Sequence, residues 1–258
     1  MLRWLGCMLL SFGLIQQAGA TALNSPSKAT ASSVVPHLTI KGAIGPAVSD
    51  HLIREINRAN SEAKAPLILL TLDTPGGLSA SLRNINQSIL SSDIPIACLV
   101  YPQGARAASA GTYILYACHI AAMSEATTLG AATPVNIAGP MGKDPAEKEK
   151  TRTPSAMEKK VLNDAIAYIR SLAQLRGRNE EWAELAITDA ATLTAQEALK
   201  ENVIDLIAGS PQELLNKLDS RQVTIKQTTK TLRLNEARLE EKKPDWRNHF
   251  IATITDPN

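Results

Sequence analysis

Short, largely apolar segments constrain the fold of this chain more than any other feature. Three of them have the length of a strand: "PLILLTLD" (66–73), "IPIACLVY" (94–101) and "HIAAMS" (119–124). A continuous apolar run of this length is typical of a strand that is buried on both faces of a parallel sheet. Segments with apolar residues at helical spacing lie at 48–63 and 78–89, on either side of the first run. This alternation predicts an α/β fold in which helices flank a mostly parallel sheet.

Helix signals continue in the second half of the chain. A long helix is predicted to begin near Ser155 and to end at Gly177, because glycine is common just beyond a helix C-terminus. Thr194 and Glu197 have the spacing of a capping box, which predicts the start of a shorter helix.

The N-terminus has the composition of a secretory signal peptide. Arg3 precedes an apolar run that is too short to span a bilayer, and "AGA" ends at Ala20 as a small-residue cleavage site. We expect residues 1–20 to be removed, and the polar stretch 21–35 to form a mobile leader. The alternative is an uncleaved membrane anchor. An exported protein is therefore predicted.

Two later segments lack the α/β pattern. Residues 138–156 are rich in proline, glycine and charge, which predicts a loop that is functional or disordered. Residues 219–258 are polar and weakly patterned, and we expect a C-terminal tail there. No transmembrane helix is predicted after the signal peptide.

Composition and cysteine usage argue against several classes of protein. The net charge is +2 and no basic run is interleaved with aromatic residues, so nucleic acid is not an expected partner. Cys7 leaves with the signal peptide. Cys98 and Cys118 either pair in an oxidising compartment or, as their apolar surroundings favour, remain small apolar core residues. No cysteine and histidine cluster has metal-ligand spacing, so no metal site is predicted.

The stretch "DTPGG" (73–77) follows the first buried run. Gly76 and Gly77 open the next helix there, and glycines leave backbone N–H groups accessible to a ligand. Such groups near a helix N-terminus suit an anion or a developing oxyanion. The alternative is an ordinary Pro-Gly turn.

The stretch "GARAASAGTYILY" (104–116) follows the second buried run and places Ser109 among small residues. If the two runs form neighbouring parallel strands, their C-terminal ends lie side by side. The N–H groups of Gly77 and Ala110 would then converge beside the Ser109 hydroxyl. The alternative is that small residues merely let a helix pack closely.

A serine nucleophile also needs a base. The four histidines, at 37, 51, 119 and 249, are poorly placed; His119 is expected at the opposite end of the sheet from Ser109. A lysine that loses its water shell through packing can act instead. Lys159 and Lys160, at the start of the long helix, are the candidates, although a solvated surface pair is the alternative.

Four segments occur together in a recognisable order: "DTPGG" (73–77), "GARAASAGTYI" (104–114), "IAYIRSLAQLRGRNEEWAE" (166–184) and "LTAQEALKENVIDLIA" (193–208). They resemble the NfeD family, membrane-associated serine proteases of the ClpP/crotonase superfamily. The resemblance spans residues 36–218. It implies a ClpP-like protease domain built from repeated β-β-α units.

The resemblance implies a Ser-Lys dyad with Ser109 as nucleophile and Lys160 as general base, Lys159 being the fallback. Gly77 and Ala110 would form the oxyanion hole, with Gly76 a further candidate. No metal or organic cofactor is implied. The stretch "TLGAATPVN" holds no histidine, which favours the lysine dyad over the histidine-based triad of the wider superfamily.

The family also implies a substrate and an assembly. It implies an endopeptidase that cleaves apolar segments of stomatin-like membrane proteins, works on the periplasmic side, and forms a homodimer or larger assembly. Long members continue into transmembrane helices, so the tail at 219–258 would precede a missing membrane region and membrane association would be indirect. The rival interpretations are a signal-peptide-peptidase-like protease, an acyl-CoA enzyme of the crotonase type, and a catalytically idle module that binds partner proteins.

Overall fold

The computed structural model describes residues 33–134 and 155–244 of the chain. The predicted signal peptide, most of the leader, most of the 138–156 segment and the end of the tail lie outside the described residues.

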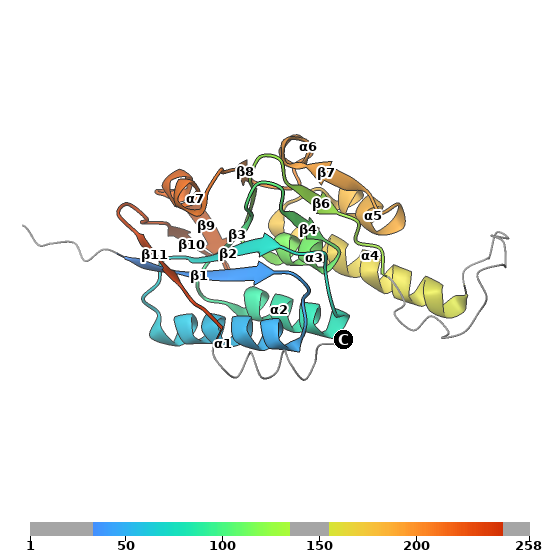
Figure 1. The fold of residues 1–258 in the computed structure, drawn as a ribbon, viewed down its shortest axis with the longest axis horizontal. Helices are drawn as coiled ribbons and strands as arrows, with labels where there is room; N and C mark the ends of the chain where they lie inside the picture. Colours follow the sequence, from blue (N-terminus) through green and yellow to red (C-terminus); the bar gives the residue numbers. More distant parts are fainter. Residues whose placement is uncertain (1–32, 135–154, 245–258) are drawn as a thin grey trace, which may run out of the picture. The chain divides into compact units, whose positions relative to one another are not determined.

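A six-stranded sheet forms the centre of the fold (Figure 1), in the order β11-β1-β2-β3-β5-β8, and every neighbouring pair is parallel. Its strands are β1 (Val34–Lys41), β2 (Ile68–Asp73), β3 (Ile96–Val100), β5 (Ile120–Met123), β8 (Leu206–Ile207) and β11 (Arg238–Glu241). The three apolar runs of the sequence are β2, β3 and β5, which lie near the middle of the sheet. The predicted α/β fold with a parallel sheet is confirmed.

Both faces of the central strands are buried because side chains alternate between them. Leu70 and Val100 contribute to the core beneath the helices on one face, while Leu69 and Leu99 contribute to the core on the other. The first face is covered by α1 (Pro46–Glu62), α2 (Ser79–Ser91), α3 (Ala110–Ala117), α4 (Ala156–Arg176) and α5 (Glu180–Thr188). The second face is covered by α7 (Pro211–Leu218) and by the antiparallel pair β9 (Gln222–Ile225) and β10 (Thr228–Thr231).

The helix ends follow the capping signals of the sequence. Ser155 and Glu158 form a capping box at the start of α4, and Gly177 ends that helix in the left-handed region at φ 65°. The predicted capping box of Thr194 and Glu197 begins α6 (Ala195–Lys200). These predictions are confirmed.

A second, three-stranded sheet lies beside the first. It contains β4 (Arg106–Ala108), β6 (Thr128–Gly130) and β7 (Thr192–Thr194), in the order β4-β6-β7. The sequence suggested that Ser109 directly follows the buried strand β3. In the structure, Ser109 follows the short strand β4 instead. A three-residue strand is too short to show a period, so β4 could not be recognised before its partner was known.

Part of the predicted polar tail is folded. Its first residues form β9 and β10, and β11 then pairs with β1 as an edge strand of the central sheet. Most side chains of β10 and β11 are exposed, so these strands lack the apolar pattern by which strands are recognised.

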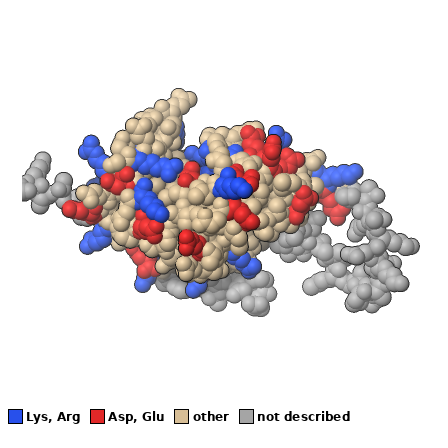
Figure 2. Space-filling model, turned by 90° about the horizontal axis from the view of Figure 1, so that it is seen from above, with Lys and Arg blue, Asp and Glu red and all other residues tan. Residues whose placement is uncertain are grey.

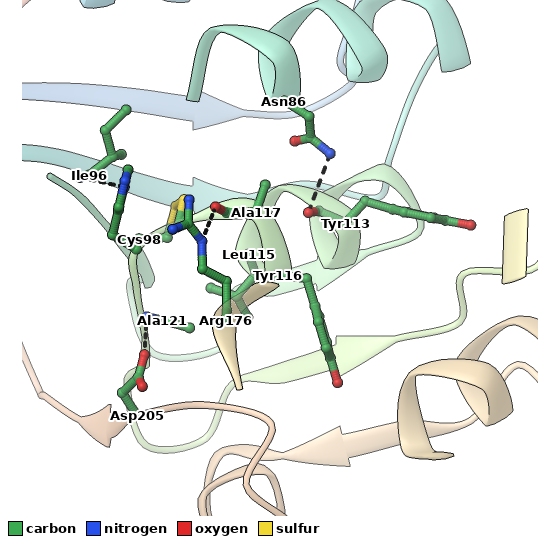
Figure 3. The surroundings of a disulfide bond; sticks show 12 residues. Asn86, Ile96, Cys98, Tyr113, Leu115, Tyr116, Ala117, Ala121, Arg176 and Asp205 are labelled. Carbon is green, nitrogen blue, oxygen red and sulfur yellow. Dashed lines mark hydrogen bonds between the residues drawn. A yellow bond between two sulfur atoms is a disulfide. The ribbon is translucent and has the colours of Figure 1, made fainter. Parts of the chain in front are cut away.

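Cys98 and Cys118 form a disulfide with a Cα–Cα distance of 6.0 Å (Figure 3). The sequence interpretation favoured two unpaired apolar residues, and the structure corrects it. Cys98 lies in β3 and contributes to the core on the side of α3, whereas Cys118 is the residue that ends α3. The end of α3 therefore lies close enough to β3 for Cys118 to bond Cys98.

The charged surface is mixed. On the face drawn in Figure 2, lysine and arginine side chains are interspersed with aspartate and glutamate rather than gathered into one basic region. Within the described ranges, no helix has both the length and the apolar character needed to cross a bilayer.

Candidate active site

Ser109 has an uncommon backbone conformation. Its φ of 52° and ψ of −117° place it outside the regions that residues with a Cβ normally adopt, at the turn between β4 and α3. Such a conformation costs about 1–3 kcal/mol and is often found at functional sites. Although Ser109 occupies the N-cap position of α3, its side chain makes no capping hydrogen bond. The hydroxyl is therefore left for another role.

Backbone hydrogen bonds hold this turn from both sides. The Ser109 N–H donates to the Gly130 carbonyl at the end of β6 (3.0 Å), and the Ser109 carbonyl accepts from the Thr112 N–H (2.9 Å). On the other side, the Thr74 N–H donates to the Arg106 carbonyl (2.7 Å) and the Ala108 N–H donates to the Thr74 carbonyl (3.1 Å). These bonds place the end of β4 beside the end of β2.

The two glycines after β2 occupy positions that exclude a side chain. Gly76 has a φ of +114°, and a Cβ there would lie 2.7 Å from the Ser109 Cβ and 3.0 Å from its Oγ. A Cβ on Gly77 would overlap the backbone of Ile44. Gly76 also receives support from Thr74, whose hydroxyl accepts the Gly76 N–H at 3.0 Å. Glycine is thus required at both positions by close approach.

The N–H groups of Gly77 and Ala110 find no hydrogen-bond acceptor among the described residues. Ala110 is the first residue of α3, where an N–H group has no partner within the helix. Unpaired N–H groups near a helix N-terminus are donors of the kind that can stabilise an oxyanion.

A cavity of about 480 Å³ brings most of the candidate residues together. It is lined by Gly77, Ser79, Leu82, Arg83, Ser109, Ala110, Tyr113, Ala132, Pro134, Met157, Lys160, Val161, Asp164, Ala165 and Tyr168. Both predicted oxyanion donors, the serine and Lys160 are among these residues. Lys159 is not, and Gly76 lies against Ser109 without lining the cavity.

Lys160 is exposed, whereas the sequence interpretation expected a buried base. The reason is its position in the second turn of α4. The helices with the most extensive contacts to α4 among the described residues are α3 and α5, and the buried residues of α4 begin only at Ala165. The wall of the cavity near Lys160 is therefore open to water in the chain by itself.

One wall of the cavity is polar, and the sequence did not indicate it. Arg83 of α2 contacts Asp164 of α4 at 2.6 Å, and its guanidinium lies 3.9 Å from the centre of the Tyr168 ring. The Tyr168 hydroxyl accepts from the Asn86 amide (3.0 Å), and its ring stacks on Tyr113. Burial raises the pKa of Tyr113 well above its ordinary value. These contacts join residues that are about 55 to 85 positions apart, which a local sequence pattern cannot reveal.

No histidine of the described residues lines the cavity. His119 directly precedes β5, and its Nδ1 accepts the Ile96 N–H at 3.2 Å. Burial, reinforced by neighbouring arginines, lowers its pKa from 6.5 to about 3. His37 and His51 bond elsewhere, to Thr71 and to a backbone carbonyl near the end of β11. His249 lies outside the described residues.

The far end of α3 is fixed by two arginines. Arg178 Nη1 donates to the carbonyls of Leu115 (3.1 Å) and Tyr116 (2.9 Å), and Arg176 Nε donates to that of Ala117 (2.9 Å). Cations at a helix C-terminus satisfy its last carbonyls and complement its dipole. The helix that begins directly after Ser109 is therefore anchored at its other end.

Together, the fold and the cavity define an α/β protein with a serine on a strained turn beside two unpaired amide groups. The chain belongs to the NfeD1b family: the model of the NfeD1b N-terminal domain matches residues 34–228.

Similar proteins agree with this assignment. The chain is 38% identical over 232 residues to the membrane-bound protease PH1510 of Pyrococcus horikoshii. The match covers 88% of this chain and 50% of PH1510, so the chain spans half the length of that relative.

Solved structures of the same protease are also similar. One is the 1510-N membrane-bound stomatin-specific protease with a lysine replaced by alanine, in complex with a substrate peptide. It has a TM-score of 0.73 and 37% identity, over 88% of this chain and 99% of that one. A serine-to-alanine mutant of 1510-N has a TM-score of 0.72 and 36% identity, over 83% and 100% of the two chains.

Proposed function

We propose that this chain is a serine endopeptidase in which Ser109 is the nucleophile and Lys160 is the general base. The observation that carries the proposal is the single cavity that gathers Ser109, Lys160 and the unpaired N–H groups of Gly77 and Ala110. The family relationship supports it, since the solved relatives are proteases.

The reaction follows from the position of these groups. Ser109 Oγ attacks the scissile carbonyl carbon, and the Oγ proton passes to Lys160 Nζ. The carbonyl electrons move to oxygen, and the resulting oxyanion accepts hydrogen bonds from Gly77 and Ala110. Lys160 then gives its proton to the leaving amine as the C–N bond breaks. A water molecule then attacks the acyl carbon and gives a proton to Lys160, and the same N–H groups hold the second oxyanion. The C–O bond to Ser109 Oγ breaks as Lys160 returns the proton to Oγ, which frees the acid product and restores the serine.

The exposure of Lys160 gives the substrate a part in this scheme. Only a neutral amine can accept the serine proton, and removal of water from around a lysine favours that form. A peptide lying in the cavity would cover the open wall beside Lys160. We therefore expect catalysis to depend on the apolar contacts of the substrate as well as on its scissile bond.

The inferred substrate is an apolar segment of a stomatin-like protein. Much of the cavity is apolar, and its apolar lining comes from Leu82, Tyr113, Ala132, Pro134, Met157, Val161 and Ala165. The related 1510-N protease is described as stomatin-specific, which favours the same class of partner here.

We infer that the domain works outside the cytoplasm, beside a membrane. The apolar N-terminus supports export, and the Cys98–Cys118 disulfide fits an oxidising compartment. Leu78 and Met157 are exposed near the cavity, and such apolar residues favour a homodimer. N-terminal sequencing of the purified protein that finds Met1 retained would contradict export, and a monomer in sedimentation at micromolar concentration would contradict assembly.

A fluorophosphonate probe, which reacts with activated serines, tests the proposal. The wild-type chain should be labelled at Ser109 and should cleave a peptide from a stomatin-like C-terminus. Ser109→Ala should remove both activities and unfold at the same temperature, because the substitution deletes one hydroxyl. Persistent cleavage by Ser109→Ala would exclude the serine. An unlabelled wild-type chain that still binds the peptide would support a catalytically idle binding module.

The two lysines provide a matched pair for the base. Lys160→Ala should lower kcat by about 10²–10⁴-fold, the usual contribution of general acid–base catalysis. Lys159→Ala, one residue away and outside the cavity, should keep its activity. The reverse result would assign the base to Lys159, and two active variants would remove lysine from the mechanism.

A further inference from the structure

Thr112 lies three residues after Ser109 and is fully buried in the first turn of α3. Its hydroxyl contacts three backbone groups. Oγ1 lies 2.9 Å from the Ala107 carbonyl oxygen and 3.0 Å from that of Gly130, and it accepts the Gly130 N–H at 3.1 Å. Thr112 does not line the cavity, so it does not touch a substrate there.

The same backbone groups support the nucleophile. Ala107 lies in β4, two residues before Ser109, and the Gly130 carbonyl accepts the Ser109 N–H. β4 and β6 pair in parallel only as far as Ala108 and Gly130. The Thr112 hydroxyl thus bridges the two strands at the end of their ladder, close to the place where Ser109 leaves β4.

Gly130 is constrained from its other side as well. It has a φ of +127°, and a Cβ there would overlap the backbone of Ala191. The Ala191 carbonyl also accepts the N–H of the next residue, Ala131, at 2.9 Å. Gly130 is therefore a fixed point, and Thr112 ties the strained turn to it.

We infer that Thr112 is a positioning residue that holds Ser109 in its strained conformation through Gly130 and Ala107. A strained backbone persists only where its surroundings over-determine it. Without the hydroxyl, the buried Gly130 N–H loses the Thr112 oxygen as an acceptor, the Ala107 and Gly130 carbonyls lose a shared donor, and the turn is less firmly held. This inference rests on the proposed role of Ser109 as nucleophile.

Three variants test it by the rate of cleavage. Thr112→Val replaces the hydroxyl by a methyl group of similar size, whereas Thr112→Ser keeps the hydroxyl. Thr71→Val is the matched control, because Thr71 is another buried threonine whose hydroxyl bonds Leu38, His37 and Thr39 away from the cavity. Thr112→Ala removes the same hydroxyl and replaces Thr112→Val if that variant does not fold.

Thr112→Val should lower kcat by about 10²-fold with KM unchanged, since a small misplacement of a reacting group has an effect of that size. Thr112→Ser should recover most of the rate, and Thr71→Val should keep the wild-type kcat. Equal losses in Thr112→Val and Thr71→Val would reduce Thr112 to a general packing residue. Failure of Thr112→Ser to recover the rate, or a Thr112→Val variant of wild-type kcat, would overturn the inference.

Amide hydrogen exchange separates this inference from the proposed function. The amides of Ser109 and Gly130 should exchange at least about tenfold faster in Thr112→Val than in the wild-type chain, because the opening of the turn is no longer opposed by the hydroxyl. They should be unchanged in Thr71→Val. If the wild-type chain proves inactive, the protease proposal fails while exchange still decides the role of Thr112. Unchanged protection of both amides in Thr112→Val would refute that role.

Discussion

Gly76→Ala is expected to disable the nucleophile from a neighbouring loop. The substitution has two separate costs. At a φ of +114° a residue with a Cβ is strained, which costs about 1–3 kcal/mol. The new methyl group would also lie 2.7 Å from the Ser109 Cβ and 3.0 Å from its Oγ, an overlap that costs about 1–3 kcal/mol if nothing moves. The free energy of unfolding should therefore fall by about 2–6 kcal/mol.

Relief of this overlap requires movement of Ser109 itself. Gly76 is held on both sides, because the Ile44 N–H donates to its carbonyl and its own N–H donates to the Thr74 hydroxyl, so we expect the Ser109 side of the contact to give way. A displacement near 1 Å lowers a rate by about 10²-fold, and labelling by a fluorophosphonate should slow by that factor. Thermal unfolding and the labelling rate are the two measurements.

Gly177→Ala is the matched control. Gly177 also has a positive φ, 65°, but a Cβ there would meet nothing within 4 Å. Only the backbone cost of about 1–2 kcal/mol is expected, with labelling unchanged. If Gly76→Ala were labelled at the wild-type rate, or lost no more stability than Gly177→Ala, the close approach of Gly76 to the nucleophile would have no functional meaning.

Three further predictions concern the support of the site. Arg178→Met should lower the free energy of unfolding by about 3–5 kcal/mol, because Asp205 and two carbonyls of α3 lose a buried hydrogen-bond donor. A denaturant titration measures this change, and a loss below about 1 kcal/mol would contradict the prediction. His119, whose pKa falls from 6.5 to about 3, stays neutral in the folded chain while the unfolded chain binds a proton, so stability should be full above pH 6.5 and decline toward pH 3 by up to about 1.4 kcal/mol per pH unit. His119→Gln should flatten that slope, and an unchanged slope would point to other groups. Reduction of the Cys98–Cys118 bond, which joins residues 20 positions apart, should lower stability by about 3 kcal/mol, and free thiols in the untreated protein would refute the pairing.

Many of the strands and helix ends could be predicted, because burial and capping are visible in the local sequence. The strands β2 and β3 are apolar on both faces since both faces pack, and this made a parallel sheet predictable. Ser155, Gly177 and Thr194 ended or began helices as predicted, because caps depend on residues within one turn. The small residues around Ser109 and the glycines at 76 and 77 were also informative, since a crowded turn excludes side chains.

The tertiary structure alone decided which distant residues meet. Lys159 and Lys160 differ by one helical step, and only the packing of α4 shows that Lys160 faces the cavity. Three further contacts join segments whose own sequences do not predict their partner. These are the pairing of β4 with β6, the pairing of β11 with β1, and the contact of Arg83 with Asp164. The same holds for the disulfide, whose two cysteines resemble ordinary core residues in the sequence. Sequence periodicity reports how deeply a residue is buried, but the identity of its neighbour is set by the three-dimensional path of the chain.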